Sequence, residues 1–540
     1  MPRIRIQSII AVLFGCFLLD AALASHAEEP NQIPHLACKG EITHLVVDGQ
    51  PFLILGGELM NSSPASAAHM RPVWPRLAAL HINTVLAGVS WELVEPEEGH
   101  FDFNVVDDLI KDARANHLHL VFLWLASWKN GMSSYAPLWV KENSQRFPRA
   151  QGRTGQTLDV LSPMPGVQTQ AADARAFAAL MRHIREVDGT AHTVLMMQVE
   201  NEVGILDNTR DFSTLANQNF AQQVPSTLMK YLEQHKETLT QPVRELWQSS
   251  GFRPSGTWAD VFGGGLLGDE LFMAWNYANY IEGVVAAGKK EYPIPMYVNA
   301  WQAQLQYPRP GYYPSGGPNH RNLDIWRAAG NAIDFYSADD YARDFESVLK
   351  EYNIPGNPLF IPETEPGDPA AYNVFLAFGK GAFGFSPFGV DHWEEPNTQL
   401  AKAYELIDQV KLQLFDDRPG RFMNGFVLSP ERPKVTLQMG GLDLTITLDD
   451  AYYSHAKRGG GIIIMDDRNH FWGVGRGFMV AFSAASGTGQ IGIGAVDKES
   501  CTNGTCSPIL RLNGDETNQG KTWRFTDDEF SVEQISLFRY

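Results

Sequence analysis

Eight short apolar runs of strand type recur between residues 52 and 391, and helical or loop-like segments separate them. Alternating β and α segments predict a parallel sheet, and eight repeats predict that the sheet closes into a (β/α)₈ TIM barrel. Helical periodicity is expected in residues 70–80, 105–116, 177–187, 273–287 and 401–415, and residues 205–262 form a long polar insertion. The expected strands are residues 52–58, 82–91, 118–128, 193–204, 295–301, 333–339, 358–365 and 382–391.

The pattern changes after residue 415. Residues 434–439 and 442–448 alternate polar and apolar side chains around a Gly-Gly turn, and two further strand-like runs follow without helices. This pattern favours a small antiparallel β-sandwich domain. At 540 residues the chain also exceeds the size of a single ordinary core. We therefore expect a barrel over residues 28–420 and a sandwich over residues 421–540.

The first 27 residues have the pattern of a secretory signal peptide. Arg3 and Arg5 precede an apolar run over residues 9–19, and a small-x-small site ends at Ala27. Export with cleavage after Ala27 is expected, to the periplasm or the cell exterior, and the apolar run is too short to span a bilayer.

Three cysteines remain after the expected cleavage. An oxidising compartment permits a Cys501–Cys506 disulfide and leaves Cys38 unpaired. The remaining His and Cys residues show no metal-ligand spacing, so no metal site is expected.

Acidic residues outnumber basic ones, with 62 Asp and Glu against 43 Lys and Arg. This excess argues against nucleic acid or an anionic membrane surface as a partner.

Two of the expected barrel strands end in carboxylates. Glu200-Asn201-Glu202 ends the fourth strand, and Glu363-Thr364-Glu365 ends the seventh. Barrel enzymes keep their catalytic groups at the carboxyl ends of the strands, so both sets open onto one rim. Glycoside hydrolysis requires such a pair of carboxyl groups. Strand alternation separates Asn201 from the two glutamates, so Asn201 and Glu202 can both reach a substrate only if the strand end is bulged.

Residues 198–204 resemble the acid/base motif of glycoside hydrolase family 35, the β-galactosidases. Residues 91–103 resemble a stretch of that family and of neighbouring family 42, and residues 358–363 resemble the family's nucleophile strand. The resemblance covers roughly residues 40–400. The C-terminal segment resembles the small sandwich of a divergent bacterial branch.

The resemblance implies roles for individual residues. Glu202 matches the acid/base, Asn201 the amide that binds the sugar 2-hydroxyl, and Glu363 the nucleophile. Glu200 matches a position that supports the site and its substrate. Glu365 is the main rival to Glu363, because strict alternation places both on one face. The resemblance implies no cofactor.

The third strand departs from the family pattern. Many members carry an Arg-Pro-Gly-Pro-Tyr stretch there, whereas this chain has residues 123–131 with a different composition. Sugar contacts at this strand therefore cannot be transferred. Candidate sugar-stacking aromatics, each of which could instead be a core residue, are Trp124, Trp128, Tyr341 and Trp393.

The sequence thus predicts a retaining exo-β-galactosidase. The family resemblance suggests terminal galactose on oligosaccharides or plant polysaccharide fragments such as xyloglucan. Alternatives are another β-glycosidase or endo-glycanase of the same clan, a non-catalytic sugar-binding barrel, or a structural surface protein. The oligomeric state is left open.

Overall fold

The computed structural model describes residues 32–39, 42–303, 308–392, 398–416, 418–450, 455–487, 489–502 and 504–540. The expected signal peptide, residues 1–27, and Trp393 lie outside this part of the chain. None of the helices in the described ranges combines the length and apolarity needed to cross a bilayer.

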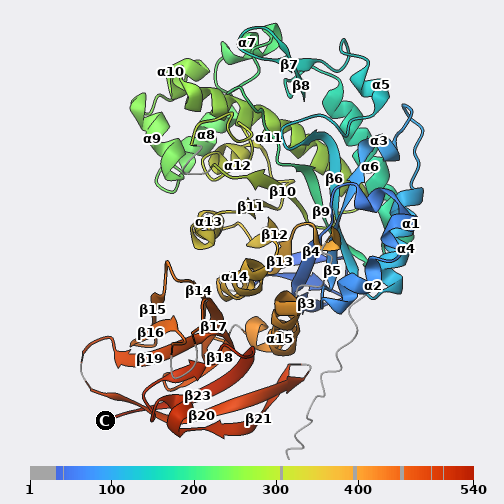
Figure 1. The fold of residues 1–540 in the computed structure, drawn as a ribbon. Helices are drawn as coiled ribbons and strands as arrows, with labels where there is room; N and C mark the ends of the chain where they lie inside the picture. The colour runs from blue at the N-terminus through green and yellow to red at the C-terminus, as the bar shows by residue number, and fades with distance from the viewer. Residues whose placement is uncertain are drawn as a thin grey trace, which may run out of the picture.

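A closed barrel of eight parallel strands forms the upper part of the molecule in Figure 1. All eight strands expected from the sequence are present, which confirms the TIM-barrel prediction. In barrel order they are β4 (Ile54–Glu58), β5 (Thr84–Ser90), β6 (His119–Lys129), β9 (Val194–Asn201), β10 (Met296–Trp301), β11 (Phe335–Asp340), β12 (Phe360–Thr364) and β13 (Gly384–Pro387).

Helices surround the barrel strands, and each of the expected helical segments is wholly or mostly helical. The polar insertion forms four short helices, α7 to α10, above the barrel in Figure 1. The helices are α1 (Ala67–Met70), α2 (Trp74–Ala79), α3 (Trp91–Val94), α4 (Asn104–Ala115), α5 (Leu138–Lys141), α6 (Thr169–Asp188), α7 (Thr214–Phe220), α8 (Ser226–Gln234), α9 (Gln241–Ser249), α10 (Trp258–Phe262), α11 (Leu266–Glu291), α12 (Leu323–Ala329), α13 (Phe345–Tyr352), α14 (Asp368–Gly379) and α15 (Thr398–Phe415).

Aromatic side chains fill the barrel interior below the catalytic rim. Tyr297 stacks on Phe335 at 5.1 Å between ring centroids, and Phe360 stacks on Phe383 at 5.2 Å. Apolar residues from β2 (Ile42–Val47) join this cluster, so the small sheet of β1 (His35–Lys39), β2 and β3 (Gln50–Phe52) closes the barrel floor. Polar groups inside the barrel are therefore concentrated at the opposite end of the strands.

Two antiparallel sheets form the C-terminal region, which confirms the expected sandwich architecture. Their facing sides enclose a separate apolar core, and Cys501 and Cys506 form a disulfide within the larger sheet. The smaller sheet contains β15 (Lys434–Met439), β16 (Leu442–Leu448), β19 (Phe478–Ala484) and β22 (Trp523–Phe525). The larger contains β14 (Phe422–Leu428), β17 (Gly459–Met465), β18 (His470–Arg476), β20 (Ile491–Thr502), β21 (Thr505–Leu512) and β23 (Ser531–Arg539).

The sandwich packs against barrel helices α14 and α15 (Figure 1). Gly379 of α14 lies so close to β14 that an added Cβ would come within 2.3 Å of Gly425. Phe375 stacks on Phe530 at 5.5 Å, and apolar residues of the larger sheet join the barrel core. α15 ends at Phe415 and β14 begins at Phe422, and the domain boundary after residue 420 stays a prediction.

Glu533 is a buried carboxyl inside the sandwich, and burial raises its pKa to about 8. The folded state therefore binds its proton more tightly than the unfolded state, and stability is lost as the pH rises from about 4.5 to 8. Trp523 Nε1 donates to Glu533 Oε2 at 2.8 Å, a bond that a glutamine oxygen can also accept.

We expect Glu533→Gln to reduce the loss of stability between pH 5 and pH 9, because glutamine carries no charge to bury. Each pKa unit corresponds to about 1.4 kcal/mol, so the gain at pH 9 should reach a few kcal/mol. Thermal unfolding at both pH values measures it. Equal pH dependence in the two proteins would contradict the prediction.

Candidate active site

The pairing of β6 with β9 is irregular where both strands approach the rim. Trp124 pairs with Val199, but the next pair is Lys129 with Asn201, so β6 advances five residues while β9 advances two. On the β9 side, Glu200 and Glu202 both have positive φ, at 61° and 44°. Such backbone is costly for a residue with a side chain and is concentrated at functional sites. The extra residues thus lie on β6, whereas on the β9 side the positive φ angles of Glu200 and Glu202 interrupt the regular strand.

Glu200 lies beneath the site and supports it. Its carboxylate oxygens accept hydrogen bonds from the backbone N–H groups of Ser127 at 3.1 Å and Trp128 at 2.7 Å. The same carboxyl is hydrogen-bonded to Asp173, and burial with this second acid raises the pKa of Glu200. Glu200 thus fixes the end of β6, and its fully buried side chain has no room to bind a sugar directly.

Glu202 projects into a buried polar cluster at the rim. Its backbone N–H donates to Asn299 Oδ1 at 3.0 Å, and Asn130 Nδ2 donates to Glu202 Oε2. Its carboxyl group also hydrogen-bonds to Asp339 of β11. Asn299 therefore fixes the backbone of Glu202, and Asn130 and Asp339 hold its side chain.

Glu363 lies across the barrel from Glu202, at the end of β12. Tyr341 donates its hydroxyl proton to Glu363 Oε1 at 2.6 Å, whereas the buried Oε2 has no hydrogen-bond partner in the described structure. One carboxylate oxygen from each of Glu202, Asp339 and Glu363 lies within 4.8 Å of the other two. Glu365 is exposed beyond the end of β12, so the geometry favours Glu363 over this rival.

Two further acids complete the cluster, and sequence reasoning missed both. Asp339 pairs with Glu363 in the β11–β12 register, and Asn299 Nδ2 donates to Asp339 Oδ2 at 2.6 Å. Glu58 ends β4, and the charges of Glu363 and Glu202 both raise its pKa. Each acid occupies the carboxyl end of a barrel strand, a position that could have marked them as candidates.

The buried acids differ in how readily they lose a proton. Burial, the charge of Glu363 and that of Glu202 raise the pKa of Asp339 and of Glu58 well above the usual range. Burial and Glu363 raise the pKa of Glu202 to about 7. Burial also raises the pKa of Glu363, but Lys129 and Tyr341 oppose that shift. The cluster therefore favours an ionised Glu363 facing a protonated Glu202, which is the division of roles that acid and nucleophile need.

Asn201 is buried in the same cluster. Its Oδ1 accepts a hydrogen bond from Lys129 Nζ at 2.9 Å. Its Nδ2 has no hydrogen-bond partner among the described residues. A buried donor without a partner is costly, so this amide is a candidate to bind a ligand hydroxyl.

The candidate sugar-stacking aromatic residues differ in their exposure to solvent. Trp124 and Trp128 are fully buried, and their indole N–H groups donate to Asp173 and to the carbonyl of Leu161. Neither ring face is open to a sugar, so the prediction that these two bind substrate was wrong. Tyr341 is 40% exposed and lies in the site, although as a donor to Glu363. Trp393 is outside the described residues.

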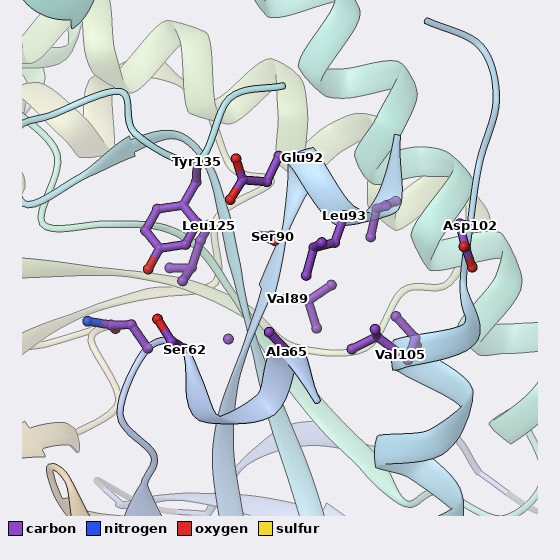
Figure 2. Close-up of a pocket in the computed structure, with 14 residues that line it drawn as sticks. Ser62, Ala65, Val89, Ser90, Glu92, Leu93, Asp102, Val105, Leu125 and Tyr135 are labelled. Carbon is purple, nitrogen blue, oxygen red and sulfur yellow. The ribbon is translucent and has the colours of Figure 1, made fainter. Parts of the chain in front are cut away.

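A small pocket lies at the carboxyl end of β5 (Figure 2). Ser62 and Ala65 line one side, Val89 and Ser90 come from the strand, and Tyr135 lies opposite. Its volume is about 90 Å³. None of the acids of the carboxyl cluster lines it, so it is not the space between the candidate catalytic carboxyl groups.

The three carboxylates of Glu202, Asp339 and Glu363 are also close enough together to hold a cation. Hydrogen-bond donors from Asn130, Asn299 and Tyr341 already contact this group. The expectation that the site needs no metal stays a prediction.

The sequence of the barrel matches a known family. Residues 68–251 match the model of glycoside hydrolase family 42, described as Beta-galactosidase, and this range includes Asn201 and Glu202. Residues 400–524 match a domain of unknown function, DUF5597, which covers α15 and most of the sandwich. This part of the barrel is therefore similar to glycoside hydrolases of the β-galactosidase type. Family 35 specifically is not supported by these matches.

Two individual relatives are also named as β-galactosidases. A Beta-galactosidase of Xanthomonas manihotis is 29% identical over 198 residues, which are 34% of this chain and 29% of that protein. Beta-galactosidase 14 of Arabidopsis thaliana is 26% identical over 215 residues, which are 37% of this chain and 22% of that protein. The matched segments thus span less than a third of the length of these relatives.

Solved structures resemble the barrel only distantly. The β-galactosidase of the psychrophilic Marinomonas ef1 is 13% identical with a TM-score of 0.45, over 67% of this chain and 60% of that one. The catalytic domain of a Paenibacillus polymyxa β-amylase is 13% identical with a TM-score of 0.44, over 65% of this chain and 96% of that one.

We expect Tyr341→Phe to lower kcat/KM and to move the acidic limb of its pH profile to higher pH. The lost hydrogen bond lowers the pKa of Glu363, so its removal raises that pKa and a higher pH is needed to ionise the carboxylate. A hydrogen bond to a charged group is worth about 1.5–3 kcal/mol, or about ten- to a hundredfold in rate.

Initial rates of aryl glycoside hydrolysis across the pH range measure both effects. Tyr540→Phe, at an exposed tyrosine of the sandwich, is the control and should leave the profile unchanged. An unshifted acidic limb in Tyr341→Phe would contradict the proposed contact.

Proposed function

We propose that this protein is a retaining exo-β-galactosidase. The observation that carries the proposal is the buried pair Glu202 and Glu363, in which one carboxylate oxygen of each residue lies within 4.8 Å of one from the other. Retaining glycosidases keep the two carboxyl groups ~5–5.5 Å apart, whereas inverting enzymes need ~6.5–9.5 Å to admit a water molecule. The pair's distance supports retention, and the match to a β-galactosidase family supports the sugar.

The proposed mechanism has two displacements. Glu363 Oε2, the oxygen without a hydrogen bond, attacks the anomeric carbon as the glycosidic C–O bond breaks and Glu202 gives its proton to the leaving oxygen. Glu202, now ionised, takes a proton from water, and the resulting nucleophile displaces Glu363 from the sugar. With a pKa of about 7, Glu202 can serve as acid in the first step and as base in the second.

The finer features of the substrate and its setting are part of the same proposal. The resemblance of residues 198–204 and 358–363 to family-35 motifs is our reason to propose terminal galactose on oligosaccharides or on plant polysaccharide fragments such as xyloglucan. The N-terminal pattern and the Cys501–Cys506 disulfide support export to an oxidising compartment.

A panel of nitrophenyl glycosides tests the proposed specificity. We expect the highest kcat/KM for the β-galactoside, with the β-anomer of galactose as the first product in proton NMR. Labelled oligosaccharides should lose single terminal residues. Faster turnover of a β-glucoside or β-mannoside would indicate another glycosidase of the clan. Binding without turnover would indicate a non-catalytic barrel.

The two carboxyl roles predict different mutant phenotypes. Glu363→Ala should abolish turnover, and azide should partly rescue it to give the α-glycosyl azide, because azide enters the space of the lost nucleophile. Glu202→Ala should slow poor leaving groups far more than activated aryl galactosides, which need little protonation. Kinetics with both substrate types and NMR of the azide product measure these effects.

Glu365→Ala is the matched control for Glu363→Ala, because Glu365 is exposed two residues further along the chain. It should retain activity. A β-configured azide product from Glu363→Ala would rule out Glu363 as the nucleophile. Loss of activity in Glu365→Ala alone would assign that role to Glu365.

A further inference from the structure

Lys129 stands at the end of β6, in the third-strand stretch that departs from the family pattern. Its side chain is buried, with 8% of the residue exposed. The backbone is fixed by a hydrogen bond from Lys129 N to Met132 O at 2.8 Å and by its pairing with Asn201 of β9. The lysine is thus built into the rim and is held independently of its charge.

The ammonium group sets the orientation of the Asn201 amide. An ammonium can only donate hydrogen bonds, so the amide atom that faces Lys129 Nζ at 2.9 Å must be the oxygen, Oδ1. The amide NH₂ is then directed away from the lysine, and Nδ2 is the buried donor without a partner. Without Lys129, nothing in this contact would distinguish the two amide orientations.

The same positive charge acts on carboxyl groups from three other strands. Lys129 lowers the pKa of Glu58 on β4, of Glu202 on β9 and of Glu363 on β12. Asp339 on β11 completes the acidic surroundings, and the Tyr135 hydroxyl is also within electrostatic reach. Burial makes it unfavourable to ionise Glu363, and the positive charge of Lys129 offsets part of that cost.

We propose that Lys129 is a positioning residue: its ammonium group orients the Asn201 amide toward the sugar hydroxyl next to the anomeric carbon. Its positive charge, buried at the rim that holds the acids, also favours the ionised form of Glu363. This inference rests on the proposed glycosidase function and adds a residue that acts through two others. It also assigns a role in the site to the third barrel strand, β6, whose sequence departs from the family pattern.

Lys129→Met tests both parts of the proposal. We expect kcat/KM to fall by about a hundredfold, the loss typical of misplaced groups in an active site. The acidic limb of the pH profile should move to higher pH, because the pKa of Glu363 rises when the positive charge is removed. The rate ratio between a galactoside and its 2-deoxy analogue should shrink, because Asn201 no longer presents its donor.

Two further substitutions separate the roles. Lys129→Gln removes the charge but keeps a donor for Asn201 Oδ1, so the acidic limb should still move while the 2-deoxy ratio is largely retained. Lys129→Arg keeps the charge and should leave the limb close to that of the unmodified protein. If Lys129→Met fails to fold, Lys129→Gln decides, and an unmoved acidic limb there overturns the proposal.

Lys289→Met is the matched control. This lysine is also largely buried and forms an ion pair with Asp334 at 2.6 Å, but it lies near the amino ends of β10 and β11. Its loss should lower stability and leave the pH profile unchanged. If the unmodified protein is inactive on every glycoside, the proposed function itself is overturned. If the unmodified protein is active but the acidic limb of the pH profile does not move in Lys129→Met or Lys129→Gln, only the role of Lys129 is overturned.

Discussion

The uneven pairing of β6 and β9 determines the shape of the whole catalytic rim. The extra residues of β6 turn the backbone N–H groups of Ser127 and Trp128 onto Glu200, and they bring Lys129 against Asn201. Regular strands would alternate their side chains and send Asn201 away from Glu202. Hydrogen bonds to buried groups hold the irregular backbone in place and compensate for the positive φ angles of β9.

Crowding of acids gives this site its chemical character. Glu58, Glu202, Asp339 and Glu363 share a space with little access to solvent, so all four cannot be ionised together. The two carboxyl groups have different neighbours: the Tyr341 hydroxyl donates to Glu363 and favours its charge, whereas the charge of Glu363 raises the pKa of Glu202. The surroundings of the two acids, rather than their residue type, therefore separate an acid from a nucleophile.

The strand order, the sandwich and the positions of Glu202 and Glu363 could be predicted from the sequence, because each depends on local pattern or on a motif of several residues. Glu58, Asp339 and Lys129 could not, since each is a single residue on its own strand and only barrel closure brings them together. Trp124 and Trp128 were misassigned because a strand pattern does not show which face meets the helices. Both rings pack outward against the core around α6 and α11.

The contact between Gly379 and Gly425 has a consequence for how such chains diversify. Two backbones meet there without a side chain between them, and the barrel core continues into the larger sheet. A recombination event that joined this barrel to a different appendage would leave a flat apolar face on α14 uncovered. Barrel and sandwich should therefore be inherited together, with substitutions at one glycine constrained by the other.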